Sequence, residues 1–347
     1  MSNHPDGPPK RFVDSLIALF INDEKELRSG WRVLLFFMAF TLAIIFIRGI
    51  AATLAKLIPS LRFLTSEPLP DAPTASRLRL LSLLIAQLET LAAAVIASFV
   101  CARWLERRTL GSIGFKLHRG WTRDFALGSL IGAAALALAV GLEAAAGAVH
   151  FTAQTTDAEM LAYNFSYLLV FFLIAGAFEE LMFRGFPLQA LIHNIGGWTA
   201  VGITSIFFGL AHIANANAST FSTINTILAG MWLGTAYLMT RSLWLATALH
   251  YSWNLVMVFV FGLPVSGITT FQNLAWLRGE SKPPLWISGG DYGPEAGAAA
   301  TLALLIATLV IWKSGWFRST AEMLAAIKHG KPERPISITA DDETLRA

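Results

Sequence analysis

The sequence of 347 residues has little charge and almost no cysteine. Only 14% of its residues are Asp, Glu, Lys or Arg, whereas a typical soluble domain has about 25%. Cys101 is the single cysteine, which excludes an intramolecular disulfide and a cluster of thiolate metal ligands. The net charge is only +3, and no basic stripe is interleaved with aromatic residues, so no nucleic-acid partner is expected. With 55% hydrophobic residues, the composition predicts a membrane protein.

Long apolar runs make up most of the chain. A helix needs about 20 mostly apolar residues to cross a bilayer. Eight runs reach or approach this length: 31–53, 78–102, 125–147, 163–184, 198–213, 222–240, 243–262 and 296–312. Most of the 26 Lys and Arg residues would lie on one side of a membrane crossed by these runs, and the segment 148–162 has none. The positive-inside rule therefore predicts an all-α polytopic protein of the cell membrane with both termini in the cytoplasm.

The same pattern divides the chain into three parts. Residues 1–30 are predicted to be a cytoplasmic segment that could hold an interfacial helix around 12–20. Residues 31–317 are predicted to be an eight-helix membrane domain, and the polar tail 318–347 is expected to be cytoplasmic and partly disordered. The loop 263–294 is rich in Gly, Pro and Trp and would lie on the outer side, where it could be a lid or a partner surface.

An acidic pair interrupts the fourth apolar run. Glu179 and Glu180 follow a long apolar stretch, and Arg184 comes one helical turn after Glu180. Each acid at membrane depth costs about 2.5–3.5 kcal/mol on insertion scales, so the pair suggests a function. The i,i+4 spacing favours an ion pair between Glu180 and Arg184. Glu179 points about 100° away from Glu180 around the helix axis, so this ion pair leaves its carboxylate available for another role. The alternative is that the two acids only mark the cytoplasmic end of a span.

Two further polar pairs occur in later apolar runs. His212 follows Phe208 by four residues, and an antiparallel hairpin that turns at Gly196 and Gly197 would place His212 at the height of Glu179. His250 and Asn254 are also four residues apart, so they share one face of a helix. Each pair taken alone could serve helix packing, because polar side chains also join helices in membranes. Together with the acids, they predict one polar pocket.

Several signatures of known intramembrane proteases are missing. No His-Glu-x-x-His helix is present, which argues against a site-two type zinc protease. No apolar run contains Gly-x-Ser-Gly to supply a serine nucleophile, and Asp291 has no intramembrane aspartate as a partner. A carboxylate, two histidines and an amide remain. This set suits hydrolysis by an activated water molecule, with hydrogen-bond donors for the oxyanion.

The ordered triple of motifs resembles a known family. Glu-Glu-x-x-x-Arg at 179–184, Phe-x-x-x-His at 208–212 and His-x-x-x-Asn at 250–254 are similar to the motifs of the CAAX protease and bacteriocin-processing (CPBP or Abi) family of intramembrane proteases. The motif-bearing core covers 163–262. The resemblance implies a bundle of about eight helices whose site opens to the cytoplasmic side. It also implies a membrane-associated peptide or protein as the substrate.

The resemblance also implies a role for each motif residue. Glu179 and His212 would activate water, and His250 and Asn254 would bind the oxyanion. Glu180 and Arg184 would support these residues.

Two questions stay open at this stage. Glu179, His212 and His250 could hold a divalent metal such as zinc through two imidazoles and a carboxylate. The family is commonly labelled a metalloprotease family, but a metal-free glutamate mechanism is also proposed for it, and we slightly favour a site without a tightly bound structural metal. A different class of function is a transporter or a non-catalytic scaffold that uses the buried Glu and His groups for proton relay or partner binding. Paired broken helices or inverted repeats would favour a transporter, and neither is evident.

Overall fold

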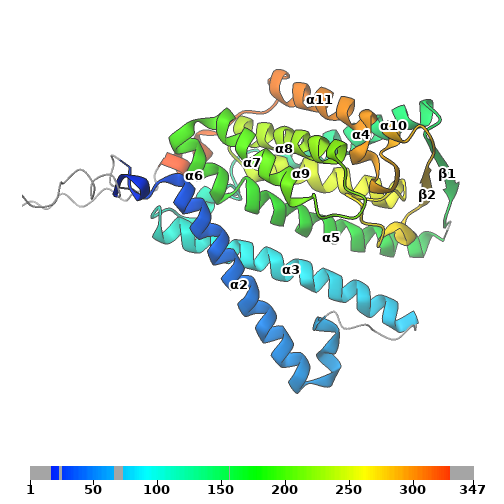
Figure 1. The fold of residues 1–347 in the computed structure, drawn as a ribbon, viewed down its shortest axis with the longest axis horizontal. Coiled ribbons are helices and arrows are strands. Elements are labelled where there is room, and N and C mark those ends of the chain that lie inside the picture. The colour runs from blue at the N-terminus through cyan, green and yellow to red at the C-terminus, as the bar shows by residue number, and fades with distance from the viewer. Residues whose placement is uncertain (1–16, 23–25, 66–72, 156, 329–347) are drawn as a thin grey trace, which may run out of the picture.

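The computed structural model describes residues 17–22, 26–65, 73–155 and 157–328 (Figure 1). Most of these residues are helical. The helices are α2 (Ser29–Leu57), α3 (Pro73–Trp104), α4 (Trp121–Ala145), α5 (Ala158–Phe183), α6 (Phe186–Ile195), α7 (Gly197–Ala211), α8 (Thr220–Thr240), α9 (Leu243–Leu255), α10 (Leu285–Ser288), α11 (Ala298–Lys313) and α12 (Ala321–Lys328). A π-helical turn, Val256–Val260, extends α9. Two short strands, β1 (Val149–Ala153) and β2 (Leu277–Ser281), complete the regular structure.

Each of the eight predicted apolar runs coincides with one of these helices. Within the described ranges, five stretches are long and apolar enough to cross a membrane: Ser29–Leu57, Arg77–Trp104, Trp121–Ala145, Ala158–Ile195 and Leu243–Val260. Helices α7 and α11 are apolar but shorter. The chain is therefore an all-α polytopic membrane protein, as predicted.

Other parts of the sequence interpretation stay predictions. These are the count of eight crossings, the three-part division of the chain, the cell membrane as location and the cytoplasmic termini. The proposed interfacial helix around 12–20 lies mostly outside the described residues, and so does the tail from 329 onward.

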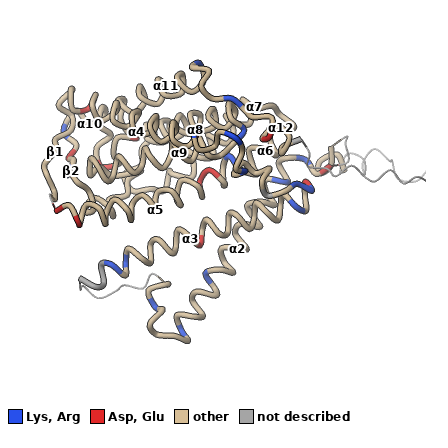
Figure 2. Tube along the Cα trace, turned by 180° about the vertical axis from the view of Figure 1, so that it is seen from behind, with Lys and Arg blue, Asp and Glu red and all other residues tan. Residues whose placement is uncertain are grey.

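Helix α9 lies at the centre of the bundle. In its apolar window 72% of the residues are buried inside the protein, against 6% for α2. Helices α4, α5 and α8 pack against α9, and α11 covers α4 and α8. Figure 1 shows α3 running beside α5 while α2 slants away from the bundle. The large apolar side chains that α2 exposes suit contact with lipid. Figure 2 shows most Lys and Arg residues at helix ends and in connecting segments.

Glycine allows α4 to approach α9 closely. A Cβ at Gly132 would overlap the carbonyl oxygen of Leu249 and the hydroxyl of Ser252. Small residues are common where membrane helices pack, because they let the two backbones come together. This contact fixes the rotation of α9 about its own axis. The rotation in turn decides where His250 and Asn254 point.

The segment from Ala158 to Ile195 forms two helices and not one continuous helix. Helix α5 ends at Phe183 and α6 begins at Phe186, with Gly185 between them. A Cβ at Gly185 would overlap the carbonyl oxygen of Leu181, so the tight connection requires glycine. Pro187 lies in the first turn of α6, where its missing N–H has no helical partner to lose. The chain then turns at Gly196, whose φ is +81°, as predicted.

The loop 263–294 contains regular structure. Strands β1 and β2 pair in antiparallel register from Val149–Ser281 to Ala153–Leu277, and this links the loop to the segment before α5. The Trp276 amide donates a hydrogen bond to the Phe259 carbonyl at 2.7 Å. The loop therefore folds back onto the bundle. Its first residues contribute to the wall of the main cavity.

Candidate active site

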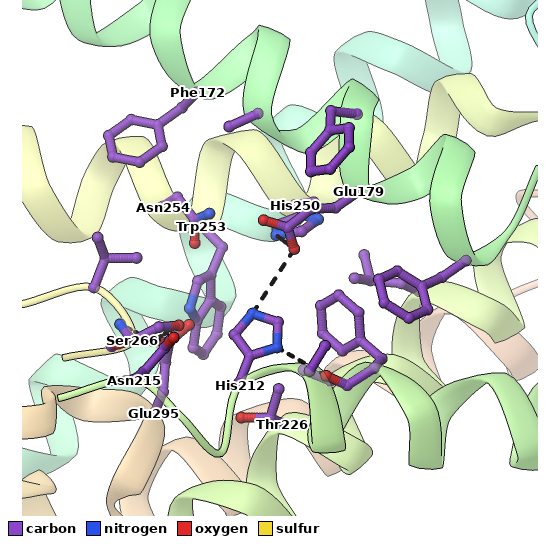
Figure 3. Close-up of a pocket in the computed structure, with 18 of the residues that line it drawn as sticks. Phe172, Glu179, His212, Asn215, Thr226, His250, Trp253, Asn254, Ser266 and Glu295 are labelled. Carbon is purple, nitrogen blue, oxygen red and sulfur yellow. Dashed lines mark hydrogen bonds and ion pairs between the residues drawn. The ribbon is translucent and has the colours of Figure 1, made fainter. Parts of the chain in front are cut away.

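One cavity of about 510 Å³ lies inside the bundle (Figure 3). Glu179 from α5, His212 from the end of α7, and His250 and Asn254 from α9 all line it. The rest of the wall is mostly apolar and includes Phe171, Phe172, Phe178, Phe208, Trp232 and Trp253. The three polar motifs thus reach a common space within an apolar interior.

Local signals in the sequence set the start of the helices that carry these residues. The Asp157 carboxylate accepts hydrogen bonds from the amides of Glu159 and Met160 at the start of α5. The Ser242 hydroxyl accepts one from the Trp244 amide at the start of α9. Such caps bind amides that the first helical turn leaves unpaired. They define where α5 and α9 begin, and hence the height at which the site residues occur.

The Glu179 carboxylate lies between two imidazole rings. Its Oε2 atom is 3.9 Å from His212 Nε2 and 3.8 Å from His250 Nε2. Both separations exceed the range of a direct hydrogen bond. The Oε2 atom is buried and accepts no hydrogen bond from the described residues. It therefore faces two ring nitrogens without bonding to either of them.

The tautomer of His212 follows from its other ring nitrogen. Nδ1 is 2.8 Å from the carbonyl oxygen of Phe208, one turn earlier. A carbonyl oxygen can only accept, so Nδ1 carries the hydrogen and Nε2 of the neutral ring is an acceptor. His212 Nε2 and Glu179 Oε2 are then two acceptors that face each other. A hydrogen donor shared between them would stabilise this arrangement.

A buried ion pair stands behind the cavity. Arg184 Nη1 donates to Glu180 Oε1 at 3.0 Å, Nη2 donates to the Gly230 carbonyl at 3.1 Å, and neither charged side chain is exposed. The guanidinium lies 4.4 Å from the ring centroid of Phe208, a cation–π distance. Glu180 Oε1 is also 2.9 Å from His250 Nδ1. The acid therefore holds the imidazole with Nε2 directed toward Glu179.

Asn254 lies one helical turn after His250 on the same face of α9. Its exposed fraction is only 9%. Its side-chain amide lines the cavity and makes no hydrogen bond within the described residues. A buried amide of this kind is able to donate to a polar group that enters the cavity.

Comparison with known proteins matched part of the chain to the family described as "Type II CAAX prenyl endopeptidase Rce1-like". The match covers residues 161–256, which we call the Rce1-like domain. No curated protein and no solved structure matched the chain. The resemblance predicted from the three motifs is thereby confirmed at the level of the family. It supports a membrane peptidase, without its substrate or its chemical mechanism.

All six predicted site residues fall within the Rce1-like domain. Four of them line the cavity, and Glu180 and Arg184 lie directly behind His250, where the predicted i,i+4 ion pair is present.

One polar part of the cavity was not predicted from the sequence, and its residues Ser266 and Glu295 lie outside the Rce1-like domain. Glu295 Oε2 accepts hydrogen bonds from the Ser266 amide and hydroxyl, and Asn215 donates to the Ser266 carbonyl at 3.0 Å. Burial raises the pKa of Glu295, against the opposing effect of the Ser266 hydrogen bonds and the nearby imidazoles. The signal in the sequence was an acid directly before the last apolar run. Glu295 lies just outside this run, whereas the predicted site residues all lie within apolar runs.

The candidate metal ligands match zinc in type but not in spacing. Two imidazoles and a carboxylate are suitable donors, and each imidazole has a partner for its other nitrogen, as metal-binding histidines usually do. Neighbouring donor atoms of a tetrahedral zinc site lie about 3.3 Å apart, because each bond is about 2.0–2.1 Å long. The separations of 3.8 and 3.9 Å exceed this value. Within the described ranges, no group of three His, Cys, Asp or Glu residues is arranged to hold a metal.

Proposed function

We propose that the protein is an intramembrane endopeptidase that hydrolyses a peptide bond of a membrane-associated protein or peptide. The observation that carries this proposal is the pair of acceptors, Glu179 Oε2 and His212 Nε2, that face each other at 3.9 Å in the cavity. One water molecule can donate its two hydrogen atoms to such a pair. The Rce1-like domain supports a peptidase of this general class.

In the proposed reaction, Glu179 and His212 polarise this water molecule. Glu179 accepts a proton as the water oxygen attacks the scissile carbonyl carbon. The same carboxyl group then returns the proton to the leaving amine, so that protons balance over the cycle. No step requires a group from outside the chain other than water and the peptide.

The oxyanion would be stabilised from the opposite wall of the cavity. The Nδ1–H of His250 donates to Glu180, so an imidazolium at this position has its Nε2–H available for the oxyanion. The unpaired Asn254 amide would supply the second donor. Donors fixed in a low-dielectric site are effective because they need no reorganisation as charge develops. Arg184 pairs with Glu180, so this carboxylate adds no unpaired negative charge beside the cavity.

We also propose that the protein resides in the cell membrane with both termini in the cytoplasm. The basic residues around the predicted spans support this orientation. A cysteine-accessibility experiment would test it. Cysteines placed near residue 10 and in the outer segment at residue 155, in a Cys101→Ala background, should react with a membrane-impermeant thiol reagent from opposite sides.

The enzymatic proposal is tested with purified protein in detergent and a library of quenched fluorescent peptides. Glu179→Ala and His212→Ala should each lower kcat/KM by at least about 10²-fold. Glu159→Gln is a matched control, because Glu159 lies in the first turn of α5 and Glu179 lies near the other end of this helix. Its activity should stay within about twofold of the wild type, since surface changes have small effects. Equal background cleavage by all four proteins would refute a peptidase and favour a proton relay or a scaffold.

A further inference from the structure

The segment that carries Glu295 is held in a fixed position. Glu295 lies in a 3₁₀ turn, Pro294–Ala296, directly before α11. Gly293 has a φ of +101°, and a Cβ there would overlap the Pro264 carbonyl oxygen. On the other side of the turn, the Asn225 amide donates to the Gly297 carbonyl at 3.0 Å. The acid is therefore anchored on both sides and is not part of a free loop.

The carboxylate of Glu295 uses only one of its two oxygens within the protein. Oε2 accepts both Ser266 hydrogen bonds, whereas Oε1 accepts none from the described residues. Ser266 has a φ of +48°, a left-handed conformation that is uncommon outside glycine. The Asn215 bond to the Ser266 carbonyl stabilises it. This network presents a carboxylate with one free oxygen to the cavity, whose wall includes Glu295, Ser266 and Asn215 (Figure 3).

The charges around the cavity do not balance. Among the described residues, the ionisable ones in its wall are Glu179, Glu295, His212 and His250, and none is Lys or Arg. Glu180 has its own partner in Arg184, but Glu295 makes no ion pair within the described part of the chain. Burying a charge is unfavourable unless it is paired, and burial indeed raises the pKa of Glu295. A cationic group that enters the cavity would compensate this carboxylate.

Much of the cavity wall is apolar. Phe37 from α2 and Phe178 from α5 line it, together with Phe171 and Met182. The polar network at Glu295 and this apolar wall differ in what they can bind. A ligand suited to both has a positive charge in one part and an apolar segment in another.

We propose that Glu295 forms a subsite for a cationic group of the peptide substrate, either a Lys or Arg side chain or a free amino terminus. This inference deepens the proposed peptidase function and rests on it. Glu295 would select the substrate and would take no part in bond cleavage. An ammonium or guanidinium group would donate to the free Oε1 atom, while apolar substrate residues contact the phenylalanine side chains of the wall.

The test uses two series of quenched peptides with the full-length protein in detergent. In the first series both ends are blocked, and Lys or its uncharged isostere norleucine is moved through each position around an apolar core. In the second series the amino terminus is free or acetylated. Glu295→Gln removes the charge, but its side-chain oxygen can still accept both Ser266 bonds. Glu280→Gln is the matched control, because Glu280 is exposed on β2 in the same outer region.

The wild type and Glu280→Gln should prefer the cationic member of at least one pair by about tenfold or more in kcat/KM, the effect expected of a charge-assisted hydrogen bond. Glu295→Gln should cleave both members equally. Preference in the first series identifies a side chain, and preference in the second identifies the amino terminus. Equal cleavage by the wild type in both series, or a preference that survives in Glu295→Gln, would overturn the inference.

A binding measurement separates this inference from the peptidase proposal. The dissociation constants of the same peptides are measured by tryptophan fluorescence in a Glu179→Gln background, with Glu295 present or replaced by Gln. A charge preference in binding without any cleavage by the wild type would support the subsite and refute the peptidase. Cleavage without a charge preference in either measurement would support the peptidase and refute the subsite. The absence of both would refute both proposals.

Discussion

Replacing Arg184 by Met should strongly destabilise the protein. Arg184 is fully buried, donates to Glu180 and to the Gly230 carbonyl, and lies over the Phe208 ring. Methionine keeps much of the apolar stem but removes every donor. The Glu180 carboxylate would then remain at 0% exposure with His250 as its only charged partner. An unpaired charge in this environment retains its desolvation penalty and loses the attraction that offsets it.

The expected magnitude follows from that loss. Removal of one partner of a buried ion pair costs about 3–5 kcal/mol. For a domain of about 150–250 residues, 1 kcal/mol corresponds to about 2–4 °C in Tm, so Tm should fall by about 6–20 °C. Thermal unfolding in detergent, followed by intrinsic fluorescence at a fixed scan rate, measures this shift. Arg184→Lys should cause a smaller decrease, because lysine keeps the charge but cannot donate to both partners with the same geometry.

A double mutant distinguishes this reasoning from a simple packing defect. Glu180→Gln removes the charge that Arg184→Met leaves unpaired, while glutamine can still accept from His250. The double mutant should therefore be more stable than Arg184→Met alone. A Tm for Arg184→Met within about 2 °C of the wild type would refute the reasoning, since it implies less than about 1 kcal/mol. A double mutant less stable than Arg184→Met would refute it as well.

Three further predictions concern activity. Asn254→Ala should lower kcat by about 10²–10³-fold in steady-state cleavage, as expected for loss of an oxyanion donor, and an effect confined to KM would contradict that role. The Lys-to-norleucine ratio of kcat/KM should decline as pH falls, because a protonated Glu295 carries no charge. Burial raises its pKa from 4.5, so the midpoint of this decline should lie above 4.5, and a midpoint below that value would contradict the assignment. The metal chelator 1,10-phenanthroline should leave the rate within about twofold because the donor spacing does not suit zinc, and a loss that zinc reverses would contradict this.

The sequence predicted the helices and the main site well because both depend on local spacing. Apolar length located all eight runs, and the i,i+4 rule predicted the Glu180–Arg184 pair and the common face of His250 and Asn254. The hairpin argument about Gly196 placed Glu179 and His212 at one height, and their side chains lie 3.9 Å apart. These inferences needed only the geometry of a helix and one turn.

The features that the sequence analysis missed depend on contacts between distant segments. The pairing of β1 with β2 joins residues more than a hundred positions apart, and neither strand has a strong pattern of its own. Glu295 enters the cavity only because the outer loop folds back and Ser266 holds its carboxylate. The break between α5 and α6 is different, because it has a local signal. Gly185 is followed by Pro187 in the first turn of α6, and this pattern could have located the break.

The central claim is that Glu179 and His212 act on the same water molecule. The most direct test is the kcat/KM of Glu179→Gln, His212→Ala and the double mutant on one cleaved peptide. If the two residues form one unit, the double mutant should be no slower than the slower single mutant, because the first substitution already abolishes the shared function. Losses that multiply in the double mutant would show that the two residues act independently, and would contradict the account.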